Sequence, residues 1–227
     1  MFKIKKDLTK FLILATGDGW QLAPKESEKV IYALNDFVYY EKYRIMPDVL
    51  FMLDVLNEKP QVISGLQNLG DTISRINKIG VPFIAPYKYE EIPLSEAFPL
   101  KECVKEFGLP YFTNTICYMI AYALIKGAKE IELFGVNQAG SHEYMEEKGG
   151  VEYWIGIAVG RGVKVTINGK DSQLLRHKGR YDRGGLMYGY LASFDEVMRQ
   201  EEQFGKPIIL KLLSPVKPYS KVVRNVN

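Results

Sequence analysis

Few residues of the kinds that build metal centres, disulfide frameworks or membrane spans occur in this sequence. Its 227 residues include 2 cysteines and 2 histidines, and Cys103 and Cys117 show neither CxxC nor Cys/His ligand spacing. Both cysteines are therefore predicted to be buried free thiols in a reducing compartment. The apolar run at residues 11–15 is too short for a signal-peptide core or a membrane span, so a cytoplasmic protein without a membrane partner is expected.

A strong excess of charge of one sign is also absent. The 30 basic and 27 acidic side chains leave a net charge of +3, which is too balanced to attract nucleic acid by the field of the protein alone. Nucleic acid is therefore not expected as a partner. The hydrophobic content of 47% is enough for a full core, and the length fits one domain with an appendage.

Short apolar runs alternate with helical patterns as far as residue 167. This alternation predicts an α/β protein with a Rossmann-like, mostly parallel sheet flanked by helices, over residues 1–167. Residues 168–227 are expected to form a C-terminal extension packed on that core, with a glycine-rich basic flap at 174–190, a helix at 194–204 and an extended arm from 214. The predicted strands lie at 11–15, 30–34, 49–53, 81–86, 131–134 and 163–167, and the predicted helices at 69–79, 100–107, 113–127 and 152–160.

Polar residues follow three of the predicted strands at the point where each ends. The first strand ends in Thr16-Gly17-Asp18-Gly19, the second in Asn35-Asp36 and the third in Asp54. Ligands bind at the carboxyl ends of strands in open α/β sheets, so these residues are predicted to line one crevice. Helix caps and turns are the structural alternative for each residue. Gly17 and Gly19 can bring the backbone close to a phosphate, although an ordinary tight turn also explains them.

The segment 112–137 combines a polar helix start, a buried helix, a glycine stop and a buried strand. Its helix start offers hydroxyl and amide groups that can cap the first turn, and its strand is followed by Gly135-Val136-Asn137. The same strand-end argument places these groups in the crevice. The predicted ligand-binding residues from this segment are Thr113, Asn114, Thr115, Gly135 and Asn137.

A polar loop is predicted at 138–150, and it contains the two residues with the clearest chemical potential. His142 can act as a general base, and Tyr144 can donate a hydrogen bond to a phosphate. An exposed histidine without a role and a tyrosine that anchors its own loop are the structural alternatives. Since the nearby acidic residues lack an aspartate-rich ligand pattern, a solvated acidic face is expected there and no metal site. Those acidic residues are Glu143, Glu146, Glu147 and Glu152.

The order of these motifs, TGDG, LND, LD, TNT and KEIELFGVN, resembles the sialyltransferase-like Rossmann group. This group includes bacterial CMP-sialic acid transferases, hydroxymethylpterin diphosphokinase-like proteins and phage proteins of unassigned activity. The resemblance covers about residues 11–167. It implies a nucleotide-sugar donor, CMP-linked as the first choice, with no required cofactor.

The resemblance also implies roles for individual residues. Gly17, Asp18 and Gly19 match the start of the GNGPS loop that cradles the nucleotide in the transferases, while Trp20 and Gln21 replace its Pro-Ser. Asn35 matches the asparagine that follows the second strand in the transferases, and 113–115 resembles their donor-contacting Thr-Ser-Gly. The segment 135–137 resembles their GID motif, and Tyr144 matches a tyrosine near the leaving phosphate. The base histidine of the transferases has no counterpart in 149–153, which leaves His142, Glu147, Glu152 or a site without catalysis as the alternatives.

Three functions are compatible with the sequence. The first is a nucleotide- or nucleotide-sugar-binding protein with glycosyltransferase-like activity. The second is a non-catalytic, phage-type protein that keeps the fold to bind a nucleotide, another metabolite or a protein, in which case the compartment is the host cytoplasm. The third is pyrophosphate transfer to a pterin-like alcohol, for which the acidic residues are not convincingly grouped. The sequence is also compatible with homo-oligomers.

Overall fold

The computed structural model describes residues 6–54, 69–139, 142–175, 199 and 222–225. Residues 1–172 and 220–227 form one compact unit, and residues 173–219 form a second. The first unit therefore extends five residues beyond the predicted boundary at 167 and also takes in the end of the chain. The predicted flap and the helix at 194–204 lie almost wholly outside the described residues, as does the arm up to 221.

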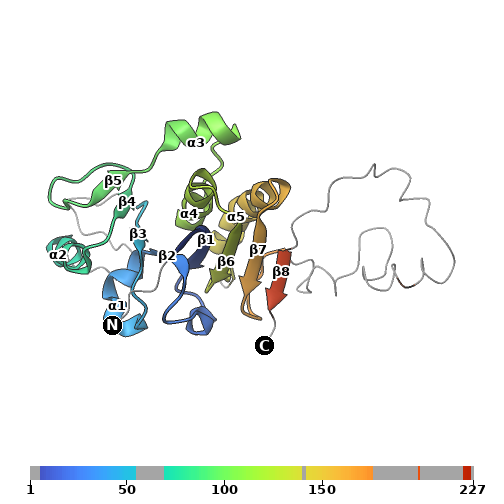
Figure 1. Ribbon diagram of the computed structural model, residues 1–227, viewed down its shortest axis with the longest axis horizontal. Helices are drawn as coiled ribbons and strands as arrows, with labels where there is room; N and C mark the ends of the chain where they lie inside the picture. The colour runs from blue at the N-terminus through green and yellow to red at the C-terminus, as the bar shows by residue number, and fades with distance from the viewer. Residues whose placement is uncertain (1–5, 55–68, 140–141, 176–198, 200–221, 226–227) are drawn as a thin grey trace. The chain divides into compact units, whose positions relative to one another are not determined.

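The first unit is built on a parallel β-sheet of eight described strands, whose order is β5-β4-β3-β2-β1-β6-β7-β8 (Figure 1). Every neighbouring pair of these strands runs parallel. The chain moves outward from β1 to β5, then returns to the other side of β1 and moves outward again to β8. The strands are β1 (Asp7–Leu14), β2 (Lys29–Leu34), β3 (Val49–Phe51), β4 (Phe83–Ala85), β5 (Ser95–Ala97), β6 (Glu130–Phe134), β7 (Lys164–Asn168) and β8 (Val222–Asn225).

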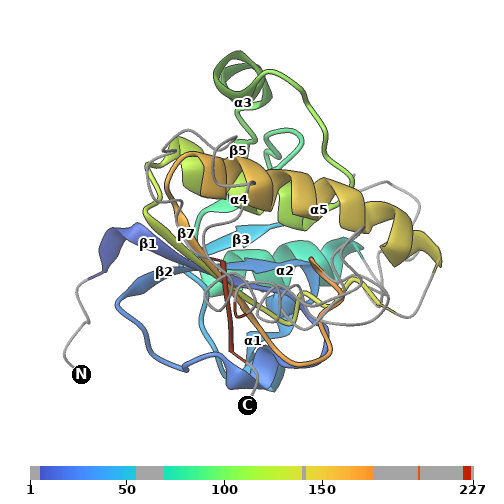
Figure 2. The same ribbon diagram turned by 90° about the vertical axis from the view of Figure 1, so that its right-hand side faces the viewer.

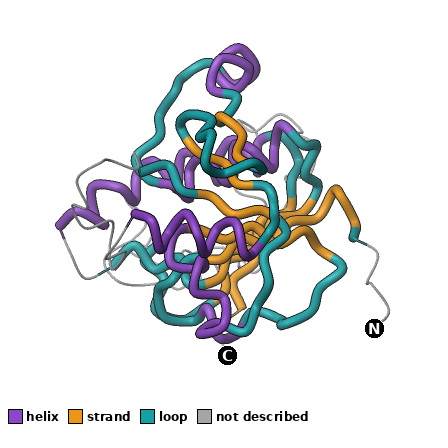
Figure 3. Tube along the Cα trace, turned by 90° about the vertical axis from the view of Figure 1, so that its left-hand side faces the viewer, coloured by secondary structure: helices purple, strands orange, loops and turns teal. Residues whose placement is uncertain are grey.

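Helices cover both faces of this sheet, as parallel strands require (Figures 2 and 3). Helices α4 (Thr115–Ile125) and α5 (His142–Gly160) lie side by side on one face, and η2 (Asn35–Tyr39), α1 (Tyr40–Tyr43) and α2 (Leu69–Ile79) lie on the other. A 3-10 turn, η1 (Trp20–Leu22), follows β1, and α3 (Leu100–Phe107) precedes α4. The fold is therefore an α/β, Rossmann-like layered sheet.

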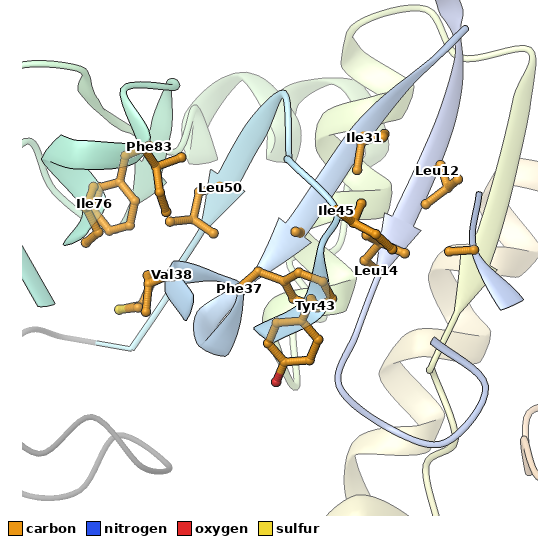
Figure 4. Close-up of a cluster of buried hydrophobic side chains, with 14 of the residues drawn as sticks. Leu12, Leu14, Ile31, Phe37, Val38, Tyr43, Ile45, Leu50, Ile76 and Phe83 are labelled. Carbon is orange, nitrogen blue, oxygen red and sulfur yellow. The ribbon is translucent and has the colours of Figure 1, made fainter. Parts of the chain in front are cut away.

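Successive side chains of the central strands point to opposite faces of the sheet and pack against the helices on each face. On the α4 face, the rings of Tyr32 and Phe51 pack against Tyr122, with centroids 6.0 and 5.5 Å away. On the other face a second cluster packs strands against η2, α1 and α2 (Figure 4). Burying each large apolar side chain contributes about 1.5–3 kcal/mol. The labelled members of this cluster are Leu12, Leu14, Ile31, Phe37, Val38, Tyr43, Ile45, Leu50, Ile76 and Phe83.

The prediction of a polar loop at 138–150 was wrong for most of its length. Helix α5 begins at His142, ten residues before the predicted helix, and it passes through Gly149 and Gly150 without a break. Gly150 is buried where α5 crosses the start of α4, and a Cβ there would collide with the side chain of Thr113. The two glycines therefore belong to a helix crossing and not to a loop.

Two short strands at the edges of the sheet were not predicted. β5 has the sequence Ser-Glu-Ala, and β8 lies in the tail for which an extended arm was expected. Neither has a sequence pattern of its own, because both are defined by pairing with a neighbour, β4 and β7 respectively. The other strands and helices predicted within the described residues are confirmed, and α2 and α3 have the predicted bounds.

The two cysteines agree with their prediction as buried free thiols. Burial raises the pKa of both thiols, to about 11 for Cys103, so neither is activated as a nucleophile. Within 6–54, 69–139 and 142–175, no helix has the length and apolar character that crossing a membrane requires.

Candidate functional site

A cavity of about 820 Å³ opens at the carboxyl edge of the sheet, the edge where all its parallel strands end. Its walls are the residues that follow β1, β2, β3 and β6, together with the start of α4 and the first turns of α5. β1 and β6 are the neighbours between which the chain reverses its direction of travel through the sheet, and open α/β sheets bind ligands at such a switch point. The sequence-predicted residues that line it are Gly17, Asp18, Asn35, Asp36, Asp54, Thr113, Asn114, Thr115, Gly135, Asn137 and Tyr144.

The loops after β1 and β6 are held together at the base of this cavity. The Gly17 N–H donates to the Gly135 carbonyl at 3.0 Å, and the Ala15 N–H donates to the Phe134 carbonyl at 2.9 Å. A Cβ on Gly17 would lie 2.5 Å from that Gly135 oxygen, and a Cβ on Gly135 would collide with the Ala15 carbonyl. Gly135 also has a φ of 68°, which favours glycine. Both glycines are therefore needed to bring the two strand ends together.

The glycine loop after β1 does not form an open phosphate cradle. The Gly17 N–H is used by the bond to Gly135, and the Gly19 N–H donates to Gln21 Oε1 at 3.2 Å. Gly19 has a φ of 93° and lies outside the cavity lining. A 3-10 turn follows this loop, so no α-helix N-terminus points from it toward a ligand. The loop forms a tight turn whose only exposed carboxylate at the cavity is that of Asp18.

The N-terminus of α4 forms the opposite wall. Asn114 caps this helix, because its Oδ1 accepts a hydrogen bond from the Cys117 N–H at 3.2 Å. Its Nδ2 donates to Glu147 Oε2 at 3.1 Å, and Thr113 Oγ1 donates to the Glu147 carbonyl at 2.7 Å. The side chains of Thr113 and Asn114 therefore fix α5 against α4. Thr115 and Ile116, whose N–H groups belong to the first turn of α4, both line the cavity.

The residues after β2 and β3 are joined by a hydrogen bond across the strand ends. Asn35 Nδ2 donates to Asp54 Oδ2 at 3.0 Å. Asn35 has a φ of 32°, a left-handed conformation that asparagine adopts more readily than most residues. Asp36 is half-buried beside it. Burial raises the pKa of the Asp36 carboxyl, and the positive charge of Lys42 opposes this shift.

Four oxygen atoms of the lining are buried and have no hydrogen-bond partner within the described part of the chain. They are Asn35 Oδ1, Asp36 Oδ1, Asn137 Oδ1 and Gln138 Oε1. Buried polar atoms in native proteins nearly always have a partner, which can be a protein group, a water or a ligand. All four atoms are placed as hydrogen-bond acceptors, and no donor from the described part of the chain reaches them.

The charge of the lining is negative. It contains the carboxylates of Asp18, Asp36, Asp54, Glu143 and Glu147, and none of the described lining residues is a lysine, arginine or histidine. Burial raises the pKa of Glu147, the bond from Asn114 opposes the shift, and the charges of Glu143 and Asp54 add to it. In the described residues, no group of three or more histidine, cysteine, aspartate or glutamate side chains is arranged to hold a metal ion.

The two predicted catalytic residues both belong to the first turn of α5. Tyr144 lines the cavity and is 48% exposed. His142 is the first residue of the helix, and its side chain lies outside the described part of the structure. Since α5 is a helix from 142, Glu143 and Glu147 lie one turn apart and both reach the cavity, whereas Glu146 and Glu152 do not line it.

Sequence reasoning missed Gln138 as a cavity residue. It follows Asn137 directly, but it was assigned to the start of a polar loop. Gln138 is 7% exposed and has a φ of 49°. The sequence shows that Gln138 follows a buried strand end, whereas its burial depends on tertiary packing.

Comparison of the chain with protein-family models, with curated proteins and with solved structures gave no match. The resemblance to the sialyltransferase-like group therefore stays a prediction. The function has to be argued from the cavity itself.

Proposed function

We propose that the cavity at the carboxyl edge binds a nucleotide or a nucleotide sugar. The observation that carries this proposal is the position of the cavity between the ends of β1 and β6, the switch point at which open parallel sheets bind nucleotides. Asp36 follows β2, the position from which an acidic residue hydrogen-bonds a ribose hydroxyl in related folds. The volume of about 820 Å³ is suited to a ligand of this size.

The phosphate end of the ligand belongs at the start of α4. The free N–H groups of a helix N-terminus and the positive end of its dipole favour an anion. At α4 these are the N–H groups of Thr115 and Ile116, since the Cys117 N–H is already bonded to Asn114. Elsewhere the lining is rich in carboxylates, which repel a phosphate, so the start of α4 is the most favourable place for it.

Glycosyl transfer is the chemistry that we propose for this cavity. An acceptor hydroxyl needs a general base whose pKa lies near the working pH. Glu147 fits this role better than the other lining carboxylates, because burial raises its pKa and Asn114 holds its Oε2 in place at 3.1 Å. Tyr144, one turn earlier on α5, lines the same cavity, and its hydroxyl can donate a hydrogen bond to the departing phosphate.

Thermal unfolding in the presence of ligands tests the binding proposal. Nucleotides and CMP-, UDP- and GDP-linked sugars are added at millimolar concentration and the unfolding temperature is recorded. A ligand present at 100 times its Kd stabilises the folded state by about 2.7 kcal/mol, which is several degrees for a protein of this size. If no member of the panel raises the unfolding temperature, the proposal is refuted.

Release of free sugar from a bound donor tests the chemistry. Glu147→Gln is expected to suppress turnover while donor binding persists, because the amide keeps the shape but cannot take a proton. Glu146→Gln is the matched control, since Glu146 is an exposed neighbour on the same helix that does not line the cavity. His142→Ala tests the alternative base. Loss of turnover in His142→Ala with normal turnover in Glu147→Gln would assign the base to His142.

Binding without catalysis is the second candidate function. It is favoured by the β1 loop, whose Gly17 and Gly19 N–H groups are bonded within the protein and cannot stabilise a leaving phosphate. The absence of a cationic side chain among the described lining residues points the same way. Donor binding with no sugar release by the wild type would support this function. Magnesium-dependent ATP consumption would instead indicate pyrophosphate transfer.

A further inference from the structure

The four unpaired oxygens of the cavity are amide or carboxylate oxygens, and each accepts a hydrogen bond in its observed orientation. Asn35 Oδ1 and Asp36 Oδ1 follow β2, and Asn137 Oδ1 and Gln138 Oε1 follow β6. These two strands flank β1, so the four atoms come from both sides of the switch point. A buried acceptor without a donor is costly, and four of them in one lining mark a place where a ligand can supply the donors.

The orientation of the Asn35 amide is fixed by a neighbour. Its Nδ2 donates to Asp54 Oδ2 at 3.0 Å, and exchanging the two ends of the amide would place oxygen against a carboxylate oxygen. Asn35 Oδ1 is therefore an acceptor in its observed position. Together with the adjacent Asp36 Oδ1, it makes the end of β2 a pair of acceptors.

Gln138 combines two unfavourable features at a single residue. Its side chain is 7% exposed with Oε1 unpaired, and its φ of 49° lies in the left-handed region. Residues held in such conformations are concentrated at ligand-binding sites, where the surrounding structure maintains them. A buried, unpaired and conformationally strained glutamine at the cavity is best explained by a contact with ligand.

We infer that these four oxygens form a subsite for a polyhydroxylated group, the ribose or the transferred sugar of the ligand. The inference rests on the proposed function and specifies which part of the ligand faces β2 and β6. A phosphate is excluded from the subsite, because it has no donors and would meet the carboxylates of Asp36 and Asp54. An ammonium group fits less well than hydroxyls, because three of the four residues carry neutral amides. An amide offers an acceptor and a donor together, and a hydroxyl can satisfy both.

Calorimetric titration with matched ligands tests the subsite. Nucleosides are compared with their 2′,3′-dideoxy forms, and free hexoses with their deoxy forms, so that the two arms distinguish ribose from sugar. The expected result in one arm is at least a tenfold loss of affinity when the hydroxyls are removed. Equal affinity of the hydroxylated and deoxy ligands in both arms, or tighter binding of an aminodeoxy analogue, would overturn the inference.

Two variants connect this result to the subsite. Each of the variants Gln138→Gly and Asn137→Ala is expected to lower the affinity for the hydroxylated ligand at least tenfold. The affinity for the deoxy ligand is expected to stay unchanged. Asn77→Ala is the control, because Asn77 is exposed on α2 and its Nδ2 is bonded to the Glu91 carbonyl, away from the cavity. Unfolding temperatures show that each variant is folded. Unchanged affinity in both cavity variants would refute the subsite.

The outcomes separate this inference from the proposed function. Nucleotides that bind equally well with and without ribose or sugar hydroxyls would support the proposed function and refute the subsite. A free hexose that binds with the same dependence on Gln138, while every nucleotide fails, would refute the proposed function and support the subsite. No binding of any hydroxylated ligand at millimolar concentration would refute both.

Discussion

Replacement of Gln138 by glycine is expected to stabilise the folded protein. The substitution removes a buried oxygen without a partner, which costs about 1–3 kcal/mol, and relieves a left-handed backbone, which costs about 1–2 kcal/mol outside glycine. Against this, glycine adds about 0.5–1 kcal/mol of chain entropy to the unfolded state, and burial of two methylenes worth about 1.6 kcal/mol is lost. The balance is a gain of about 1 kcal/mol.

Thermal and urea unfolding of the ligand-free protein measure this gain. About 1 kcal/mol corresponds to a rise of about 2–4 °C in the unfolding temperature for a chain of this length. The control is Gln21→Gly, where the glutamine is exposed and its φ is not positive. That variant is expected to lose about 1–2.5 kcal/mol, because it adds chain entropy, relieves no strain and removes the acceptor of the Gly19 N–H.

A loss of stability in Gln138→Gly comparable to that of Gln21→Gly would refute the reasoning. It would mean that Gln138 Oε1 finds a water molecule in the ligand-free protein and that the left-handed backbone is not strained. A gain in stability together with a loss of ligand affinity would identify Gln138 as a residue whose side chain serves binding at the expense of the fold.

Three further predictions concern the frame of the cavity. Gly135→Ala is expected to lose at least about 2 kcal/mol in urea unfolding, because its Cβ would collide with a carbonyl of the β1 loop at a positive φ. Lys29→Met is expected to lower the free energy of unfolding by about 2 kcal/mol at pH 7, because Lys29 is 17% exposed and pairs with Glu130 at 2.7 Å and with Glu132 at 2.8 Å. Burial disfavours the ionised form of Glu130, but the bond from Lys29 outweighs burial and lowers the pKa of Glu130 in the folded protein. The stabilisation is therefore present above pH 4.5, and the difference in stability between wild type and variant should shrink as the pH falls through the folded pKa. Asn114→Ala is expected to lower the free energy of unfolding by about 1 kcal/mol, because it removes the cap of α4. It should also raise the pKa of Glu147 further in an NMR titration, since Asn114 donates to that carboxylate. An unchanged titration of Glu147 would contradict this hydrogen bond.

The position of the cavity could be predicted from the sequence because it depends on local signals. The central strands are rich in apolar residues, and each is followed within three residues by glycine, asparagine or aspartate. Once the strands are parallel, these residues must meet at one edge, whatever their order in the sheet. The residues after β1, β2, β3 and β6 do line one cavity, which follows from this rule alone.

The side chains that complete the cavity could not be predicted because their positions depend on packing. Gly149 and Gly150 read as loop residues in isolation, and only the close approach of Thr113 explains a buried glycine within α5. Without that helix, Glu143 and Glu147 have no defined spacing. Similarly, β5 and β8 exist through their pairing partners and leave no periodic pattern of their own.

The negative charge of the cavity limits which part of a nucleotide-sugar donor, the ligand that the motif resemblance implies, can bind in it. The resemblance and the cavity agree on location, since the TGDG, LND, TNT and GVN motifs all reach the lining. They differ on chemistry, because a donor such as a CMP-linked sugar carries negative charge, whereas the described lining offers carboxylates and unpaired acceptors. A neutral, hydroxyl-rich group bound near Asn35 and Gln138, with its phosphate confined to the start of α4, satisfies both observations. Selectivity at this site should therefore come from the hydroxyls of the ligand more than from its phosphate.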